Sequence, residues 1–236
     1  MPPPQPDPQP TPQPPPSTPA SLGITRILTF GDSMTAGTTS PPVTFRALDA
    51  GLAQSYPFKL QTLLTAQYST QTVSVFNAGI AGRRATQDRS RLSRAIADSS
   101  PDLVVLLEGA NDLNSIVGPA VNAAIDDTVA AMEDMVRDTV ARGLPVFLAT
   151  LPPQRPDGPK AGGVEYLDKY NNDLKTMAST KGAIVIEVNA QLPLSLIGQD
   201  GLHPTELGYQ TLAEIMFEAI KTRYEIATVT PSTVSR

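Results

Sequence analysis

The chain has 236 residues, of which 40% are hydrophobic and 17% are charged. This length and balance are typical of one folded domain with a full hydrophobic core. The net charge of −5 argues against a nucleic-acid-binding surface, and no apolar run is long enough to span a bilayer.

The chain has no cysteine and a single histidine, His203. These counts exclude disulfides, thiol catalysis and a zinc site built from cysteines or several histidines of one chain. A Ca²⁺ or Mg²⁺ site made of carboxylates alone stays open, although no EF-hand spacing is present.

Three regions are predicted from composition: a linker or stalk over residues 1–21, a folded domain over 22–227, and a flexible tail over 228–236. The first region consists mainly of Pro, Gln, Thr and Ser, which favours extended polyproline II. Because such stalks suit exported proteins, we expect a secreted, periplasmic or envelope-attached protein. The alternative is a cytoplasmic protein with a proline-rich tail.

The first predicted strand, Thr25–Phe30, runs directly into Gly31-Asp32-Ser33. A strand, a tight turn and the start of a helix would hold the Ser33 hydroxyl at the carboxyl edge of a sheet. There Ser33 is either a nucleophile, if a base reaches it, or a helix cap. The long segment Thr38–Ser55 follows, and we expect it to wall or cover a substrate site.

Helices and strands then alternate to the end of the chain. The predicted strands are Thr72–Asn77, Leu103–Leu107, Pro145–Thr150 and Ala183–Val188. The predicted helices are Tyr56–Tyr68, an arginine-rich helix that buries Leu92 and Ile96, Val121–Ala141, Glu165–Ala178 and Thr205–Tyr224. Five strands separated by helices, without hairpin signals, predict a parallel sheet covered on both faces.

The arginine-rich helix and the turn before it carry five arginines within twelve residues: Arg83, Arg84, Arg89, Arg91 and Arg94. We expect them to form a solvated helix face. The alternative is a site for an anionic group of the substrate.

Asp200 and His203 lie three residues apart in a glycine-containing turn before the last helix. This spacing lets the carboxylate accept a hydrogen bond from one imidazole nitrogen and leaves the other free to take a proton. We expect Pro204 to occupy the first helical position and to keep His203 extended. A single histidine can also be purely structural.

Two further turns supply candidate hydrogen-bond donors. Asn111 follows a buried strand, where its amide can point over the sheet edge, and Gly82 can bring a bare N–H close to a ligand. With the Ser33 N–H they make three convergent donors. Each feature alone could be an ordinary turn residue, but all of them occur after the expected elements.

In combination these turns resemble the SGNH or GDSL hydrolase family. The matching motifs are Gly31-Asp32-Ser33-Met34, Asn77 to Gly82, Gly109-Ala110-Asn111-Asp112 and Asp200-Gly201-Leu202-His203-Pro204. The resemblance implies a flavodoxin-like three-layer α/β/α sandwich and a triad of Ser33, His203 and Asp200. It implies an oxyanion hole of Ser33, Gly82 and Asn111, with Gly79 as runner-up to Gly82, and no cofactor or metal.

We therefore expect a serine ester hydrolase acting on a small-molecule or carbohydrate ester. Short acyl groups, including acetyl groups on carbohydrate, compete with the longer chains of lysophospholipases and thioesterases. A different class of function is a non-catalytic carbohydrate- or surface-binding module that kept the fold.

Overall fold

The computed structural model describes residues 20–40 and 53–226. Nearly all of the predicted stalk over residues 1–21 and the whole predicted tail over 228–236 therefore lie outside the described residues. Most of the segment Thr38–Ser55 lies outside them as well. Among the described helices, none is long and apolar enough to cross a membrane.

Five parallel strands form the central sheet, in the order β3-β2-β4-β5-β6. Their bounds are β2 (Arg26–Gly31), β3 (Ser74–Gly79), β4 (Leu103–Leu107), β5 (Val146–Ala149) and β6 (Ile184–Ile186). The prediction of a five-stranded parallel sheet is confirmed, and the order is that of flavodoxin-like folds.

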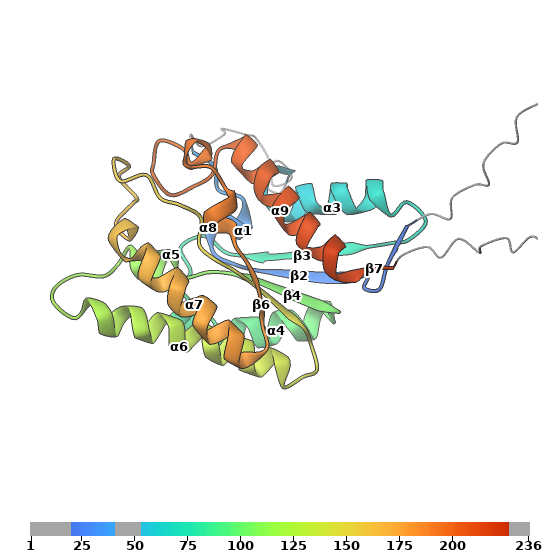
Figure 1. Cartoon of the computed structure of the whole chain (residues 1–236), viewed down its shortest axis with the longest axis horizontal. Coiled ribbons are helices and arrows are strands. Elements are labelled where there is room, and N and C mark those ends of the chain that lie inside the picture. The colour runs from blue at the N-terminus through green and yellow to red at the C-terminus, as the bar shows by residue number, and fades with distance from the viewer. Residues whose placement is uncertain (1–19, 41–52, 227–236) are drawn as a thin grey trace, which may run out of the picture.

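Helices cover both faces of the sheet, so the chain forms three layers (Figure 1). One face carries α3 (Tyr56–Gln67) and α9 (Glu206–Tyr224), which pack against each other. The other face carries α4 (Arg89–Ser99), α6 (Val121–Val140) and α7 (Leu167–Lys181). Short helices α1 (Ser33–Ala36), α5 (Ala110–Leu113) and α8 (Val188–Gln191) lie in the connections.

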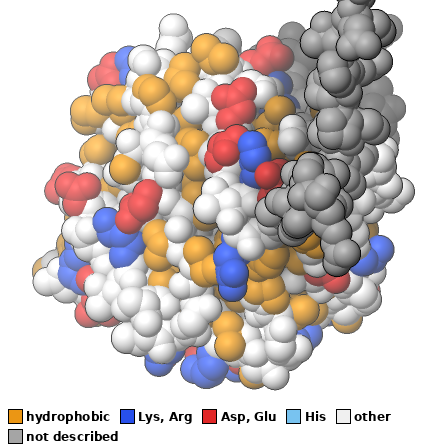
Figure 2. Space-filling model, turned by 45° about the vertical axis from the view of Figure 1, so that its right-hand side comes forward, with side chains coloured by type: hydrophobic (Ala, Val, Ile, Leu, Met, Phe, Trp, Pro, Cys, Tyr) orange, Lys and Arg blue, Asp and Glu red, His pale blue; other side chains and the backbone are white. Residues whose placement is uncertain are grey.

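The core lies where the sequence has its longest apolar runs. All five residues of β4, Leu103 to Leu107, are fully buried between β2 and β5. A continuous apolar run of this kind is what a parallel strand covered on both faces requires. On the visible face of Figure 2, acidic and basic side chains are interspersed.

The later elements depart from their predicted bounds. A 3₁₀ turn, η2 (Val164–Tyr166), precedes α7, and β6 is shorter than expected because the chain bends at Glu187 into α8. The Thr150 hydroxyl accepts a hydrogen bond from the Asn189 N–H and so stabilises the bend. Two two-residue strands, β1 (Ser21–Leu22) and β7 (Glu225–Ile226), pair antiparallel and were not expected.

The order of the strands in the sheet determines where a ligand site can lie. From β2 the chain crosses to β3 on one side, and then returns to form β4 on the other. The loops after β2 and β4 therefore diverge, and open α/β sheets bind ligands at such a point. Gly31 is in register with both Gly79 and Leu107, so the three loops after these strands start at one level.

Candidate active site

Ser33 is the first residue of the short helix α1. Asp32 caps this helix, with its Oδ1 accepting a hydrogen bond from the Met34 N–H at 2.9 Å. Gly37 ends the helix in the left-handed region, at φ 97°. Because the Ser33 N–H lies in the first turn, it has no partner within the helix.

The three residues of the predicted triad come together. His203 Nε2 lies 2.8 Å from Ser33 Oγ, and His203 Nδ1 lies 2.6 Å from Asp200 Oδ2. The side chains of Ser33 and His203 are buried. Residues 170 positions apart in the sequence thus form one row of hydrogen-bonded groups.

The turn from Asp200 to His203 is held by the Asp200 carboxylate itself. Its Oδ1 accepts hydrogen bonds from the backbone N–H groups of Leu202 and His203, at 3.1 and 3.0 Å. Burial alone would raise the pKa of Asp200, but the hydrogen bonds from His203 and Leu202 outweigh it and lower the pKa to about 2. Asp200 is therefore an anion near neutral pH and can orient the imidazole.

A cavity of about 400 Å³ opens beside the Ser33 hydroxyl and the imidazole. Gly82 and Asn111 line it, together with Leu202 and Lys160. The predicted nucleophile, base and donors therefore face one space.

Gly82 and Gly79 differ in whether their backbone N–H groups are free to donate a hydrogen bond to a ligand in the cavity. Gly82 has φ +78°, and its backbone N–H makes no hydrogen bond within the described residues. The Gly79 N–H is already donated to Asn77 Oδ1 at 2.9 Å. A Cβ on Gly79 would lie 2.2 Å from the Ala36 nitrogen, so this glycine is needed for the close packing of α1 on β3.

The Asn111 amide is fixed by the turn that follows Gly82. Its Nδ2 donates to the Arg83 carbonyl oxygen at 2.9 Å and lies 3.4 Å from Asp32 Oδ2. Asp112, the next residue, accepts hydrogen bonds from the Ala85 N–H and the Thr86 hydroxyl, both at 2.8 Å. The loops after β3 and β4 are thereby tied together.

The expectation of a solvated arginine face is wrong for Arg91, whose side chain is only 13% exposed. Its guanidinium donates to the carbonyl oxygens of Gly31 and Ala78, pairs with Asp88 and stacks on the Phe30 ring at 3.7 Å. Arg91 therefore joins the carboxyl ends of β2 and β3. Arginine-rich composition gave no signal of this, because the partners are distant in the sequence.

Asp88 also pairs with Arg83, the residue after Gly82, so Arg83 and Arg91 share one buried carboxylate. Burial raises the pKa of Asp88, but hydrogen bonds from Arg91, Glu108 and Arg83 outweigh it and lower the pKa. Burial, the hydrogen bond to Asp88 and its negative charge raise the pKa of Glu108. Glu108 is therefore the neutral partner of the pair.

Asp32 is a further buried acid beneath the site. Burial raises the pKa of Asp32 to about 7, and the charge of Asp112 contributes to the rise. The hydrogen bond from the Met34 N–H and the charge of Arg91 lower the pKa but do not outweigh burial. Within residues 20–40 and 53–226, no group of three or more acidic or histidine side chains is placed to hold a metal ion.

The raised pKa of Asp32 predicts a pH-dependent stability. An unfolded aspartate ionises near pH 3.9, so between about pH 4 and 7 the folded state keeps a proton that the unfolded state loses. The free energy of unfolding should therefore fall as pH rises through this range, by about 1.4 kcal/mol per pH unit. The asparagine in Asp32→Asn cannot ionise, so this variant should not lose stability in that pH range through residue 32.

Urea unfolding at pH 5 and pH 8 tests the prediction. The stability of Asp32→Asn relative to the unmutated chain should be greater at pH 8 than at pH 5. An equal difference at both pH values would mean that Asp32 is ionised throughout and would contradict the assignment.

Comparison with known proteins places the chain in a family. Residues 29–211 match the model of the GDSL-like lipase/acylhydrolase family. A multidomain esterase of Ruminococcus flavefaciens is 27% identical over 128 residues, which are 52% of this chain. The chain spans only 16% of that protein's length.

Solved structures share the fold. A lipase/acylhydrolase from Enterococcus faecalis has a TM-score of 0.69 at 22% identity, covering 87% of this chain and all of that one. A catalytic mutant of an acetylxylan esterase from Geobacillus stearothermophilus has a TM-score of 0.66 at 21% identity, covering 84% of this chain and 94% of that one. The family match spans most of the described residues, and the chain therefore belongs to the GDSL-like lipase/acylhydrolase family, a family of ester hydrolases.

Proposed function

We propose that this chain is a serine esterase that cleaves short acyl esters through an acyl-enzyme. Ser33 is the nucleophile, His203 the general base and Asp200 the acid that orients it. The observation that carries the proposal is the row of contacts from Ser33 Oγ to His203 Nε2 at 2.8 Å and from His203 Nδ1 to Asp200 Oδ2 at 2.6 Å.

In the first half-reaction His203 Nε2 accepts the hydroxyl proton while Ser33 Oγ bonds to the acyl carbon. The carbonyl electron pair moves onto oxygen, and the Asp200 carboxylate stabilises the protonated imidazole. When the tetrahedral intermediate collapses, the alkoxide leaves with the proton from His203. In the second half-reaction His203 deprotonates water, whose oxygen bonds to the acyl carbon. The bond between Ser33 Oγ and the acyl carbon then breaks, His203 returns the proton to Ser33 Oγ, and the carboxylic acid leaves.

Three donors would stabilise the oxyanion: the Ser33 N–H, the Gly82 N–H and the Asn111 amide. In the described part of the chain, neither backbone N–H has an acceptor. The amide nitrogen of Asn111 carries two hydrogens. Its bond to Arg83 at 2.9 Å fixes the amide plane, and its longer bond to Asp32 Oδ2 at 3.4 Å is the one that a substrate oxygen would replace. Such donors act on charge that develops only in the transition state.

The cavity favours a short acyl group. Leu202 and Pro159 are the largest apolar residues among its described lining, and most of the others are small or polar. A long acyl chain needs a longer continuous apolar surface. The acetylxylan esterases among the similar structures support acetyl groups on carbohydrate as the substrate class.

A non-catalytic binding module is the second candidate function. Such a module needs a surface that recognises its ligand, but it does not need a serine, a histidine and a carboxylate in hydrogen-bonded order. The contacts of Ser33, His203 and Asp200 therefore favour catalysis.

Export, with attachment to the cell envelope through residues 1–21, is the location we propose. It is supported by the proline-rich composition of that segment, which suits a spacer. Fractionation of the native organism should find the protein outside the cytoplasm, and a wholly cytoplasmic protein would contradict the proposal.

Hydrolysis of p-nitrophenyl esters from acetate to palmitate tests the proposed function. We expect the highest kcat/KM at acetate or another short chain and loss of turnover in Ser33→Ala. Circular dichroism of the variant checks that it is folded. A maximum at palmitate would move the substrate class to lipids or thioesters, and turnover that survives in a folded Ser33→Ala would overturn the mechanism.

Asn111→Ala should lower kcat by about 10²–10³, with a much smaller change in KM, because its amide acts on the transition state. Asn172→Ala, on the exposed face of α7, is the matched control and should keep full activity. A kcat within threefold of the unmutated chain for a folded Asn111→Ala would remove Asn111 from the oxyanion hole.

A further inference from the structure

Lys160 lies at the rim of the cavity and contacts the proposed triad from outside it. Its Nζ is 3.4 Å from Asp200 Oδ2, the same oxygen that accepts the hydrogen bond from His203 Nδ1. We propose that Lys160 is a positioning residue that disfavours the protonated form of His203 and thereby extends esterase activity to lower pH. The inference rests on the proposed function.

The backbone of Lys160 is fixed independently of its side chain. Its N–H donates to the Asp200 carbonyl oxygen at 2.8 Å, and its own carbonyl accepts from Asn114 Nδ2 at 2.8 Å. Asn114 Oδ1 in turn accepts from the Gly163 N–H at 2.6 Å. The ammonium group is therefore delivered from an anchored loop, and a substitution of the side chain leaves these bonds in place.

Glycine contacts lock the same loop onto the turn that carries Asp200. A Cβ on Gly158 would lie 2.3 Å from Gly201 Cα, so the two backbones touch. The Arg155 N–H donates to the Gly201 carbonyl oxygen at 2.9 Å. Gly201 has φ +84°, a conformation that other residues rarely adopt. The loop and the turn thus form one unit, which keeps the backbone of Lys160 beside Asp200.

The electrostatic consequence follows from the shared oxygen. A positive charge near the imidazole makes a second positive charge on His203 less favourable. The ammonium group also draws electron density from Asp200 Oδ2, which weakens that oxygen as acceptor for the Nδ1–H. Both effects act in the same direction, because each makes it harder for His203 to hold a second proton.

Among the residues that the structure describes, the other titratable groups near the triad include Asp32, from the turn between β2 and α1, and Tyr209, from α9. Both are buried, and Tyr209 is near enough to Asp200 and Asp32 for their charges to contribute, after burial, to its raised pKa. The side chains of Arg155 and Asp157 pair with each other. These groups are the same in the unmutated chain and in Lys160 variants, so a comparison isolates Lys160.

The test is the pH profile of kcat/KM for p-nitrophenyl acetate, whose acidic limb reports the base of the free enzyme. Lys160→Met should move this limb to higher pH by about half a unit, since the ammonium group is half-exposed and screened by solvent. Lys160→Glu should move the acidic limb further in the same direction. Lys160→Arg keeps the positive charge and should leave the limb where the unmutated chain has it. In 1 M salt the shift should shrink.

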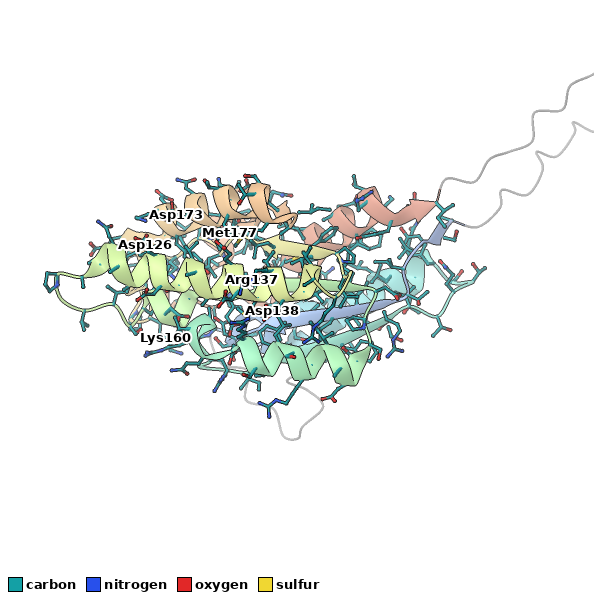
Figure 3. All side chains as sticks on the ribbon, turned by 90° about the horizontal axis from the view of Figure 1, so that it is seen from below. Asp126, Arg137, Asp138, Lys160, Asp173 and Met177 are labelled. Atoms are coloured by element: carbon teal, nitrogen blue, oxygen red, sulfur yellow. The ribbon has the colours of Figure 1, made fainter. Side chains whose placement is uncertain are left out.

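Lys169→Met is the matched control. It removes the same charge, but Lys169 lies on α7 and pairs with Asp126 of α6 and Asp173 of α7, away from the triad. Figure 3 labels Asp126, Asp173 and Lys160 and shows the first two on these neighbouring helices. The profile of Lys169→Met should coincide with that of the unmutated chain.

An unmoved acidic limb in folded Lys160→Met, or a shift that Lys160→Glu reverses, would overturn the inference. A higher KM with an unmoved limb would make Lys160 a substrate-binding residue instead. The proposed function fails on a different result, namely turnover that survives in folded Ser33→Ala, so the two failures can be told apart.

Discussion

The site depends on the close packing of α1 against the ends of the sheet strands, which only glycine permits. A Cβ on Gly31 would lie 2.5 Å from the Thr35 hydroxyl of α1 and 2.0 Å from the Leu107 carbonyl oxygen of β4, and one on Gly79 would lie 2.2 Å from the Ala36 nitrogen of α1. With no side chains in the way, the turn that carries Ser33 sits directly on the carboxyl ends of β2, β3 and β4. The loops after these strands then converge within hydrogen-bonding distance of one another.

Buried charged residues stabilise the arrangement of these loops. Arg91 bonds the carbonyl oxygens at the ends of β2 and β3, and the carboxylate of Asp88 ties Arg91 to Arg83 beside Gly82. The Arg83 carbonyl then holds Asn111. Because Arg91 and Asp88 are buried together, removing one of these two leaves an uncompensated charge, which commonly costs about 3–5 kcal/mol. The proposed donors are thus positioned by charged residues that are not among the described lining of the cavity.

The sequence predicts the features that have a local pattern. The apolar run of β4 and the alternation of helices with strands are sufficient for a five-stranded parallel sheet. The glycine-containing turns at Ser33, Asn111 and His203 were predicted to lie at one edge, and the structure brings these residues together. Their catalytic roles stay a proposal. Contacts between distant residues leave no local pattern, so the buried Arg91, the bond from Asn111 to Arg83, the approach of Lys160 to Asp200 and the pairing of β1 with β7 were missed.

In the mechanism that we propose, Ser33 Oγ becomes a nucleophile because His203 takes its proton. Labelling with a fluorophosphonate, followed by mass spectrometry of the peptides, tests this most directly, since only an activated serine displaces fluoride at a useful rate. We expect one adduct, on Ser33, and its loss in His203→Ala. Hydrolysis of esters by a protein whose Ser33 stays unlabelled, or labelling that persists without His203, would contradict it.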